Sequence, residues 1–239
     1  MENSTTQKAL KNSLLQKADY YSALDVVRQH EFHLVPIDHC IPLEKKFNLF
    51  FKRSFDLILS SVLLVVLFSW LLPLIALFIK MDSRGPVFFL QKRNKKNGLF
   101  FTCIKFRTMI VNNEADILPA KENDRRITRV GAFLRKHHLD ELPQLFNVLS
   151  GDMSIVGPRP YMISDNEKYE KLIRNYEIRH RVKPGVTGLA QVFDYVNPIT
   201  KIEQMEQRVH KDVYYVYNWS PALDAKIFIR TFFKMAGLK

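Results

Sequence analysis

The sequence predicts a mixed α/β, helix-rich domain that is attached to a membrane by one long apolar helix. Three observations support this fold class. Residues 57–79 contain no charged side chain, residues 85–109 contain two segments that alternate between β-favouring apolar and basic residues, and several later segments carry apolar residues at helical spacing. With 239 residues, the chain is long enough for one good-sized core, or for one domain with appendages.

The first segment, residues 1–46, is a predominantly polar extension in which no chemistry is visible. Leu24, Val26 and Val27 lie among charged residues in a pattern that allows a short amphipathic helix. We interpret the extension as a solvated or partner-docking arm.

The apolar run predicts a membrane helix over residues 47–82. Roughly 20 apolar residues cross a bilayer core as a helix, and buried helices of soluble proteins rarely lack a polar face over such a length. Basic residues flank the run on both sides, whereas they normally mark the cytoplasmic side. A re-entrant helix, bent near Ser69 and Pro73, would keep both flanks cytoplasmic, because proline lacks an N–H and crowds the carbonyl of residue 69. A single tilted span is the alternative.

The remaining elements belong to a predicted domain over residues 83–239. Strands at 85–93 and 99–109 are joined by a basic turn, and residues 111–130 predict a loop. Helical spacing indicates helices at 139–149, 167–181 and 201–217, with a turn at 183–188. The tail, residues 223–239, combines apolar and basic residues in a way that suits an amphipathic segment at a membrane surface. Strand content should be low.

The charge balance indicates a polyanionic partner. The formal net charge is +12, which suits nucleic acid, anionic lipid headgroups or a phosphorylated substrate. The sequence contains no helix-turn-helix, RNA-binding aromatic pair or zinc motif, so we expect no nucleic-acid partner. The two cysteines, Cys40 and Cys103, fit no metal spacing and form no disulfide framework.

Two adjacent carboxylates, Asp140 and Glu141, are the strongest candidates for chemistry. Asp140 lies where a helix should begin, so a role as N-cap, with Pro143 in the first turn, is the simplest interpretation. Alternatively, a carboxylate at a helix N-terminus stays ionised and faces a natural docking place for phosphate. Such a carboxylate can attack phosphorus to form an acyl phosphate, while its neighbour holds Mg²⁺. Arg135 lies just upstream in a basic stretch.

Three further basic residues are candidates for binding phosphate. Arg159 lies between Pro158 and Pro160, which restrict the backbone and can fix a guanidinium for bidentate contacts. An incidental surface arginine in a structural turn is the alternative. Lys105 and Arg107 would share one face of the second strand, and the same choice applies to both.

Six stretches of the sequence have the order and spacing typical of one protein family: KRSFDLIL, GPVFFLQKR, IKFRTM, LDELPQLFNVLSGDMSIVGPRP, VKPGVTGLAQV and VYYVYNWSPALDAKI. From about Lys52 onward the chain resembles the bacterial sugar transferases, or monotopic phosphoglycosyl transferases. Members transfer a sugar 1-phosphate from a nucleotide diphosphate sugar, usually a UDP-sugar, to polyprenol phosphate. The resemblance implies an enzyme of the bacterial inner membrane, with its catalytic domain on the cytoplasmic face, that initiates synthesis of a surface glycan or glycoconjugate.

The resemblance also assigns roles to individual residues. Asp140 would attack the β-phosphorus, release UMP and form a phosphosugar-aspartate, which polyprenol phosphate (undecaprenyl phosphate) would attack in turn. Glu141 would help to bind Mg²⁺. The family's re-entrant helix would explain the two basic flanks of the apolar run. Basic family positions near the phosphates fall on Lys105, Arg135 and Arg159, and a further acidic functional position falls on Asp224.

Two stretches depart from the family pattern. The family commonly bends its membrane helix at a Ser-Pro pair, whereas here the proline that follows Ser69 is Pro73, so the bend could be shifted by about a turn. After GLAQV the family often continues Asn-Gly-Arg, whereas this chain has Phe193-Asp194-Tyr195. This loop could select a different sugar, or another arginine could substitute.

Two other functions remain open on the sequence alone. A membrane-anchored nucleotide-sugar phosphohydrolase would use the same acyl-phosphate chemistry with water as acceptor. A non-catalytic, membrane-tethered protein would bind polyanions through its basic surface, although the intact Asp140–Glu141 pair with Lys105 and Arg159 argues against it. The sugar and the glycan pathway are not encoded in any motif that we identify, and self-association is left open.

Overall fold

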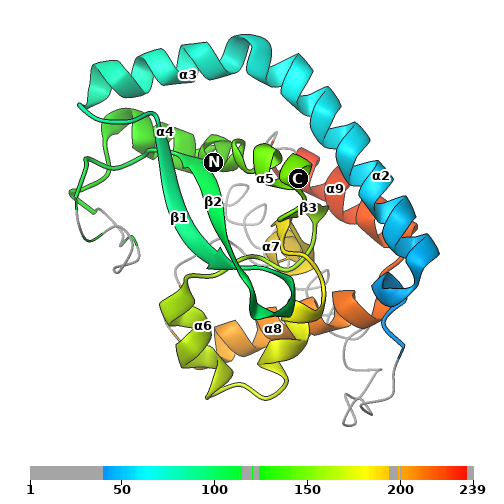
Figure 1. Ribbon diagram of the computed structural model, residues 1–239. Helices are drawn as coiled ribbons and strands as arrows, with labels where there is room; N and C mark the ends of the chain where they lie inside the picture. Colours follow the sequence, from blue (N-terminus) through cyan, green and yellow to red (C-terminus); the bar gives the residue numbers. More distant parts are fainter. Residues whose placement is uncertain are drawn as a thin grey trace, which may run out of the picture. The chain divides into compact units, whose positions relative to one another are not determined.

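The computed structural model describes residues 40–112, 114, 120, 124–193, 199 and 201–235 (Figure 1). The chain from Cys40 onward forms one compact unit. Most of the predicted polar extension, residues 1–39, lies outside the described residues. Its described end contains a short 3₁₀ helix, η1 (Pro42–Glu44), and contributes Ile41 and Leu43 to the hydrophobic core.

The apolar run forms one continuous, bent helix that arches over the rest of the described domain (Figure 1). It consists of α2 (Lys46–Leu63), a π-helical turn η2 (Leu64–Phe68) and α3 (Ser69–Asp82). By length and composition it could cross a membrane, with a mean hydropathy of 2.9 in its most apolar window. The π turn directly precedes Ser69, and Pro73 lies inside α3. Both features are common causes of helix bending, so the expected break is a bend within a continuous helix.

This helix has one apolar face in the core and another that is exposed. Phe68, Ile75 and Ile79 are buried, and the Phe68 ring stacks on Phe106 of the neighbouring strand. The opposite face exposes large apolar side chains such as Val65, which is 72% exposed. Only 17% of the most apolar window is buried. The described chain therefore leaves a large apolar surface uncovered.

Both ends of the bent helix are fixed to the same domain. Near its start, Arg53 donates to two carbonyls at the end of α5 (Gln144–Ser150), at 2.5 and 2.7 Å. At its far end, the buried side chain of Arg107 donates to the carbonyls of Arg84 and, at 2.8 Å, of Ser83. These arginines bind backbone carbonyls at the end of α5 and directly after α3. Neither end of the helix is separated from the domain.

The predicted hairpin is confirmed. β1 (Phe88–Asn94) and β2 (Phe100–Phe106) pair antiparallel, and the short turn η3 (Lys96–Gly98) joins them. Asn97 and Gly98 adopt φ angles of 61° and 70°. This left-handed conformation suits Asn and Gly and lets the chain reverse within a few residues.

The turn predicted at 183–188 is wrong, because this segment contains a strand. β3 (Ser154–Val156) and β4 (Gly185–Thr187) form a parallel pair. The segments approach closely next to Gly157, where a Cβ added to Gly185 would lie 2.1 Å from the Gly157 nitrogen. Pairing between segments so far apart in the chain leaves no local pattern. Strand content in the described part of the chain is low, as predicted.

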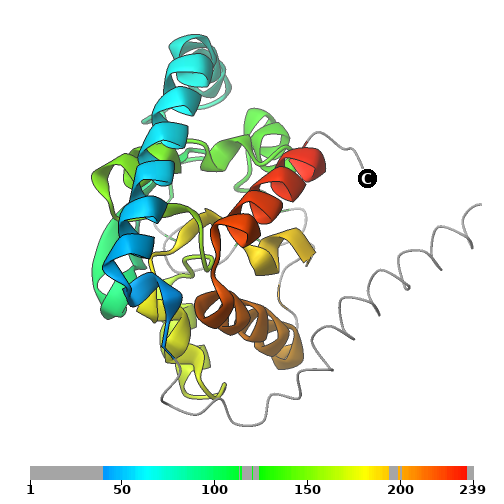
Figure 2. The same cartoon turned by 90° about the vertical axis from the view of Figure 1, so that its right-hand side faces the viewer.

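The helix predicted at 201–217 is confirmed as α8 (Ile202–Asn218), and most of the tail forms α9 (Pro221–Met235). Figure 2 shows α9 in the vicinity of α2, and an ion pair joins their first halves. The shorter helices α4 (Arg129–Lys136) and α7 (Leu189–Phe193) precede and follow the Asp140–Glu141 pair in the sequence.

The single helix predicted at 167–181 is wrong. Instead, α6 (Ile163–Glu170) ends early, Asn175 adopts a φ of 62°, and the 3₁₀ helix η5 (Tyr176–Arg181) follows. Tyr176 and Arg179 are buried, with 0% and 2% exposure. A charged residue normally marks a solvated face, so the burial of Arg179 could not be anticipated from the amphipathic pattern.

Candidate active site

The two candidate carboxylates lie in a short 3₁₀ turn, η4 (Leu139–Glu141), between α4 and α5. His138 precedes this turn with a left-handed φ of 55°. The helix α5 begins only after Pro143, which occupies its N-cap, and no side chain caps it. Of the two interpretations of Asp140, the one that made it the N-cap of this helix is therefore wrong. The left-handed residue starts a separate turn, which moves the carboxylates upstream of the helix.

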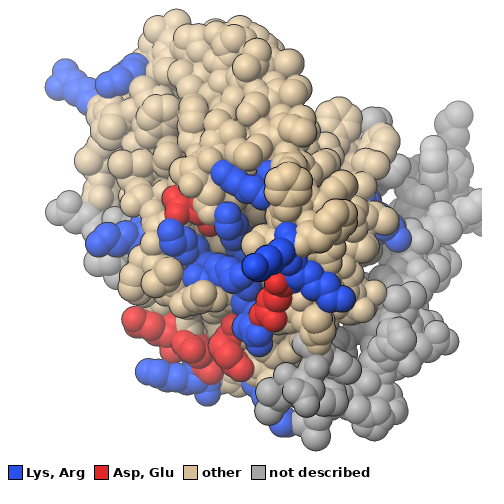
Figure 3. All heavy atoms as spheres, turned by 45° about the vertical axis from the view of Figure 1, so that its right-hand side comes forward, with Lys and Arg blue, Asp and Glu red and all other residues tan. Residues whose placement is uncertain are grey.

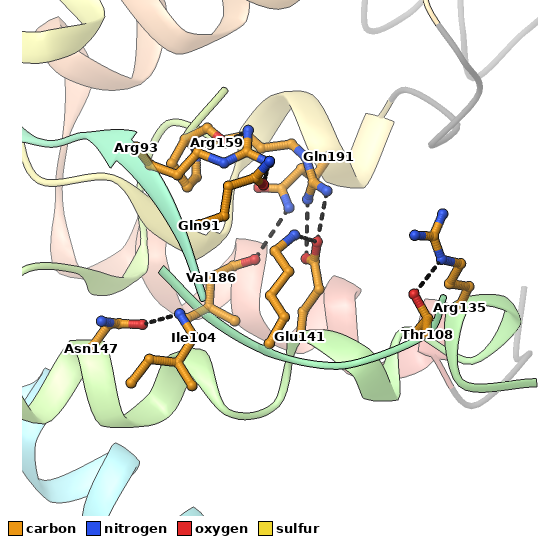
Figure 4. A network of polar contacts seen from close by, with 12 residues as sticks. Gln91, Arg93, Ile104, Thr108, Arg135, Glu141, Asn147, Arg159, Val186 and Gln191 are labelled. Atoms are coloured by element: carbon orange, nitrogen blue, oxygen red, sulfur yellow. Dashed lines mark hydrogen bonds and ion pairs between the residues drawn. The ribbon is translucent and has the colours of Figure 1, made fainter. Parts of the chain in front are cut away.

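Glu141 is held by two cations that come from distant parts of the chain (Figure 4). Its Oε1 accepts hydrogen bonds from Lys105 Nζ of β2 at 2.7 Å and from Arg159 Nη2 at 2.7 Å. Its Oε2 accepts from Arg159 Nη1 at 3.1 Å. Burial raises the pKa of the Glu141 carboxyl, but the charges of Arg159 and Lys105 outweigh burial and bring the pKa well below its ordinary value. Glu141 is thus ionised, and the bidentate contact fixes the direction of the Arg159 guanidinium.

Asp140 lies beside this ion-paired carboxylate but is not itself paired. Among the described residues, no hydrogen bond or ion pair reaches its side chain. Burial, followed by the negative charge of Glu141, raises the pKa of Asp140 to about 6, against the opposing effect of nearby cations. The hypothesis that a helix N-terminus keeps this carboxylate ionised does not apply here. Asp140 is ionised at neutral pH because its raised pKa still lies below 7.

Arg135 contributes a third guanidinium. Its Nε donates to Thr108 Oγ1 at 2.7 Å, which fixes the side chain at the end of α4 (Figure 4). Burial lowers the pKa of Arg135, and the negative charge of Asp140 is the strongest opposing influence. Within the described part of the chain, its two terminal nitrogens make no hydrogen bond. They remain available to an anion next to Asp140.

Arg107 does not share the role of Lys105. Its guanidinium is buried and binds carbonyls after α3, as described above. β2 ends at Phe106, so Arg107 leaves the strand and its side chain need not follow the face of Lys105. Of the two interpretations that the sequence left open, the structural one applies to Arg107.

Asp224 lies in a different buried cluster. Its carboxylate accepts hydrogen bonds from Tyr215 Oη at 2.8 Å and Trp219 Nε1 at 3.0 Å, and Lys52 Nζ lies 2.7 Å from Oδ2. Lys52 also lies 3.4 Å from Asp56 on α2. Among the described residues no contact links Asp224 to the Asp140–Glu141 site. Its contacts join α9 to the start of the bent helix.

The structure adds residues to the site that the sequence motifs did not single out. Arg93 of β1 donates through Nη1 to the carbonyl of Pro160 at 3.3 Å and through Nη2 to Gln91 Oε1, next to Arg159 (Figure 4). Gln191 of α7 donates to the Val186 carbonyl at 3.2 Å. Gln91 and Arg93 are two residues apart and share a face of β1, so the strand alternation could have identified them as a pair.

The loop that departs from the family pattern is described only at its start. Phe193 is 40% exposed, and its ring lies 4.8 Å from the Arg230 guanidinium and 5.9 Å from Lys211 Nζ. Asp194 and Tyr195 lie outside the described residues. An arginine of α9 therefore lies beside the position where the family pattern changes.

The donor set of the site is compatible with magnesium. No group of three or more His, Cys, Asp or Glu side chains comes together in the described residues. Magnesium is often held by only one or two carboxylates together with substrate phosphates. Asp140, whose side chain has no hydrogen bond among the described residues, and Glu141 Oε2, with a single hydrogen bond, fit this mode.

Basic side chains gather in the middle of one face of the described domain, with fewer acidic ones between them (Figure 3). The sequence profile of the family described as bacterial sugar transferase matches residues 47–237. The chain belongs to this family. The resemblance that the motifs indicated is thereby confirmed.

Relatives within this sugar transferase family carry specific names. The chain is 47% identical over 188 residues to a UDP-glucose:undecaprenyl-phosphate glucose-1-phosphate transferase of Klebsiella pneumoniae, covering 78% of this chain and 40% of that protein. A protein with the same name from Escherichia coli K12 is 45% identical over 188 residues, with the same coverage of 78% and 40%. A UDP-N-acetylgalactosamine-undecaprenyl-phosphate N-acetylgalactosaminephosphotransferase of Aeromonas hydrophila is 42% identical over 183 residues, covering 76% and 43%. The chain spans about two fifths of the length of these relatives.

Proposed function

We propose that this chain transfers a sugar 1-phosphate from a UDP-sugar to polyprenol phosphate and releases UMP. The observation that carries the proposal is the division of labour between two adjacent carboxylates. Glu141 is locked between Lys105 and Arg159, whereas Asp140 has no partner among the described residues and lies at the edge of the same cationic group. Membership of the bacterial sugar transferase family and the names of the relatives support the reaction.

In the first step, a carboxylate oxygen of Asp140 attacks the β-phosphorus of the UDP-sugar. A bond forms between this oxygen and phosphorus, the bond from the β-phosphorus to the bridging oxygen breaks, and UMP leaves with the electron pair. The cations Lys105, Arg135 and Arg159 lie where they can bind phosphate oxygens and stabilise the charge that develops on them. In the second step, a phosphate oxygen of polyprenol phosphate attacks the same phosphorus and restores the Asp140 carboxylate.

Magnesium completes the proposed site. When bound, it would neutralise phosphate charge during the transfer. Glu141, through Oε2, is the residue that we propose as its protein ligand, with Asp140 beside it. The ion pairs of Glu141 with Lys105 and Arg159 keep this carboxylate ionised and oriented for that role.

We also propose that the bent helix is re-entrant and that the domain lies on the cytoplasmic face of the inner membrane. Arg53 ties the start of the helix to α5, and Arg107, which directly follows β2, binds carbonyls just after the end of the helix. Contact of both helix ends with one domain supports entry and exit on the same side of the bilayer. Its exposed outer face would lie in lipid, and exposed apolar residues of α9, such as Phe232, would lie at the interface. Undecaprenyl phosphate would then reach the site from the same leaflet.

The reaction is tested with the full chain in detergent. UDP-glucose and UDP-N-acetylgalactosamine are offered with and without undecaprenyl phosphate, and UMP release is followed. We expect lipid-dependent turnover with one of these UDP-sugars, and a phosphosugar adduct in the absence of lipid. Asp140→Asn should abolish both, whereas Asp152→Asn, at a carboxylate paired with Lys95 2.6 Å away, should retain activity. Steady turnover without lipid would identify a phosphohydrolase, and turnover by Asp140→Asn would refute the nucleophile.

The topology is tested separately. Cysteines are placed at residue 48, in the first turn of α2, and at residue 84, just after α3. Both should react with a membrane-impermeant reagent that is applied from the cytoplasmic side. Protection of one of them, together with its labelling from the opposite side, would establish a full span. Either result is independent of the enzyme assay.

A further inference from the structure

The loop that carries Arg159 is held by two other arginines. Arg179 of η5 donates through Nη2 to the carbonyl of Arg159 at 2.5 Å. Arg93 of β1 donates to the next carbonyl, that of Pro160, at 3.3 Å. Two successive carbonyls of the loop are therefore occupied from two directions, while the side chain of Arg159 extends to Glu141. The backbone of this loop is fixed by contacts outside the Asp140–Glu141 pair.

Arg179 is unusual for an arginine because it is only 2% exposed. Its Nη2 lies 2.9 Å from Asp212 Oδ2, and its Nε donates to the same oxygen at 3.1 Å. Its Nη1 donates to Tyr176 Oη at 2.9 Å. The rings of Tyr161 and Tyr176 lie 4.4 and 5.1 Å from the guanidinium carbon. Each edge of the planar group has a partner, and two aromatic rings lie close to it.

A buried ion pair of this kind contributes little net stability by itself. Removing Arg179 and Asp212 from water is unfavourable, and well-packed apolar side chains often stabilise a protein as much or more. An arginine does offer five donors in a fixed, planar arrangement. Here the guanidinium of Arg179 connects Asp212 of α8 with the backbone carbonyl of Arg159, whose side chain binds Glu141.

We propose that Arg179, anchored by Asp212 and Tyr176, is a positioning residue that sets the place of the Arg159 guanidinium in the reaction. The inference rests on the proposed function, in which Arg159 binds both Glu141 and substrate phosphate. Groups that bind a reacting phosphate act well only when they are fixed within a fraction of an ångström. Arg179 makes no contact with Glu141 and acts through the Arg159 backbone.

The decisive variant is Arg179→Lys. A lysine keeps a positive charge near Asp212, but a single ammonium cannot reproduce the planar arrangement that reaches Asp212, Tyr176 and the Arg159 carbonyl together. We expect kcat/KM for UMP release to fall about 10- to 100-fold. In an Arg159→Lys background, the same exchange should lower kcat/KM less than about threefold, because the group that Arg179 positions is already altered. An equal loss in both backgrounds would show a general structural effect and overturn the proposal.

A second measurement does not depend on activity. Hydrogen exchange of the backbone amides at 155–162 should be faster in Arg179→Lys than in the wild-type chain, because the loop loses a bond that holds it. Arg181→Lys is the matched control, since Arg181 lies two residues away on the surface and pairs with Glu44. Unchanged exchange in Arg179→Lys would overturn the inference even if the wild-type chain released UMP. If exchange is faster in Arg179→Lys but the wild-type chain releases no UMP, the contact between Arg179 and the loop is supported and the proposed function is rejected.

If Arg179→Lys does not fold, Tyr176→Phe provides the same test with a smaller change. It retains the ring and removes the hydroxyl that accepts from Arg179 Nη1 and donates to Asn166 Oδ1 at 2.6 Å. We expect a loss of about 3- to 10-fold in kcat/KM, again reduced in the Arg159→Lys background. An additive loss would contradict the proposal in this variant too.

Discussion

Exchanging Asp140 for Asn should make the protein more stable at neutral pH, although it removes the proposed nucleophile. In the wild-type chain, burial and the adjacent charge of Glu141 disfavour the ionised form of Asp140. Asparagine has a similar shape and carries no charge, so it removes this unfavourable interaction. A catalytic group that destabilises its own fold illustrates how stability and activity oppose each other at an active site.

The magnitude follows from the pKa. A rise from the ordinary value of 3.8 to about 6 corresponds to ~3 kcal/mol at neutral pH, at 1.36 kcal/mol per pH unit. This is the largest gain expected, because asparagine must still be buried without hydrogen-bond partners, and we expect about 1–3 kcal/mol. For a chain of this size, each kcal/mol raises the unfolding midpoint by about 2–4 °C.

The gain in stability of Asp140→Asn over the wild-type chain should depend on pH. Well above pH 6, Asp140 is ionised in the folded and the unfolded chain, and the destabilisation is fully present. As the pH falls through about 6, the folded chain takes up a proton before the unfolded chain does, so the difference from Asp140→Asn shrinks. It should vanish only well below the ordinary value of 3.8, where the carboxyl is protonated in both states.

The assay is thermal unfolding in detergent between pH 8 and pH 4.5, with Glu141→Gln as the matched variant. Glu141 neutralises Lys105 and Arg159, so its exchange should lower the unfolding midpoint at neutral pH. Its folded-state pKa lies below the ordinary value, so this contribution is present above that value and is lost as the pH falls below it. A lower midpoint for Asp140→Asn at pH 7.5, or a gain that persists unchanged at pH 4.5, would refute the electrostatic explanation.

Three further predictions concern the surroundings of the site. Lys105→Met should lower kcat/KM for UMP release about 100-fold, because it removes one of the two cations that bind Glu141. Steady-state kinetics with UDP-sugar would check this, and a change confined to KM would contradict it. Lys52→Met should lower the free energy of unfolding in denaturant by about 3–5 kcal/mol, because Asp224 stays buried without its cation; a change below about 1 kcal/mol would show that the pair adds little. Asn147→Ala should lower the free energy of unfolding by about 1–3 kcal/mol in the same assay. The Asn147 side chain donates to a carbonyl of β2 at 2.8 Å and accepts from an N–H of β2 at 2.9 Å. An exchange at a surface position such as Lys136 is the control.

The sequence anticipated those features that depend on neighbouring residues. Hydropathy alone located the bent helix, and alternation located the hairpin of β1 and β2. The spacing of motifs identified the family. It also selected the Asp140–Glu141 pair as candidates for the chemistry, which stays a prediction. The two wrong element predictions have the same cause. The helix at 167–181 and the turn at 183–188 were predicted from local patterns. The burial of Arg179 and the pairing of β3 with β4 depend on segments far away in the sequence.

The order of the motifs, the charge-free run of residues 57–79 and the presence of two adjacent carboxylates are properties of the sequence itself. Only the tertiary structure decided that Glu141 is neutralised by Lys105, which is 36 residues away, while Asp140 is left with a raised pKa. It also placed Asp224 against Lys52 of the apolar helix, with no hydrogen bond or ion pair to the dyad among the described residues. The physical reason is that charge pairing and burial depend on which side chains the fold brings within a few ångströms, and sequence separation does not encode those distances.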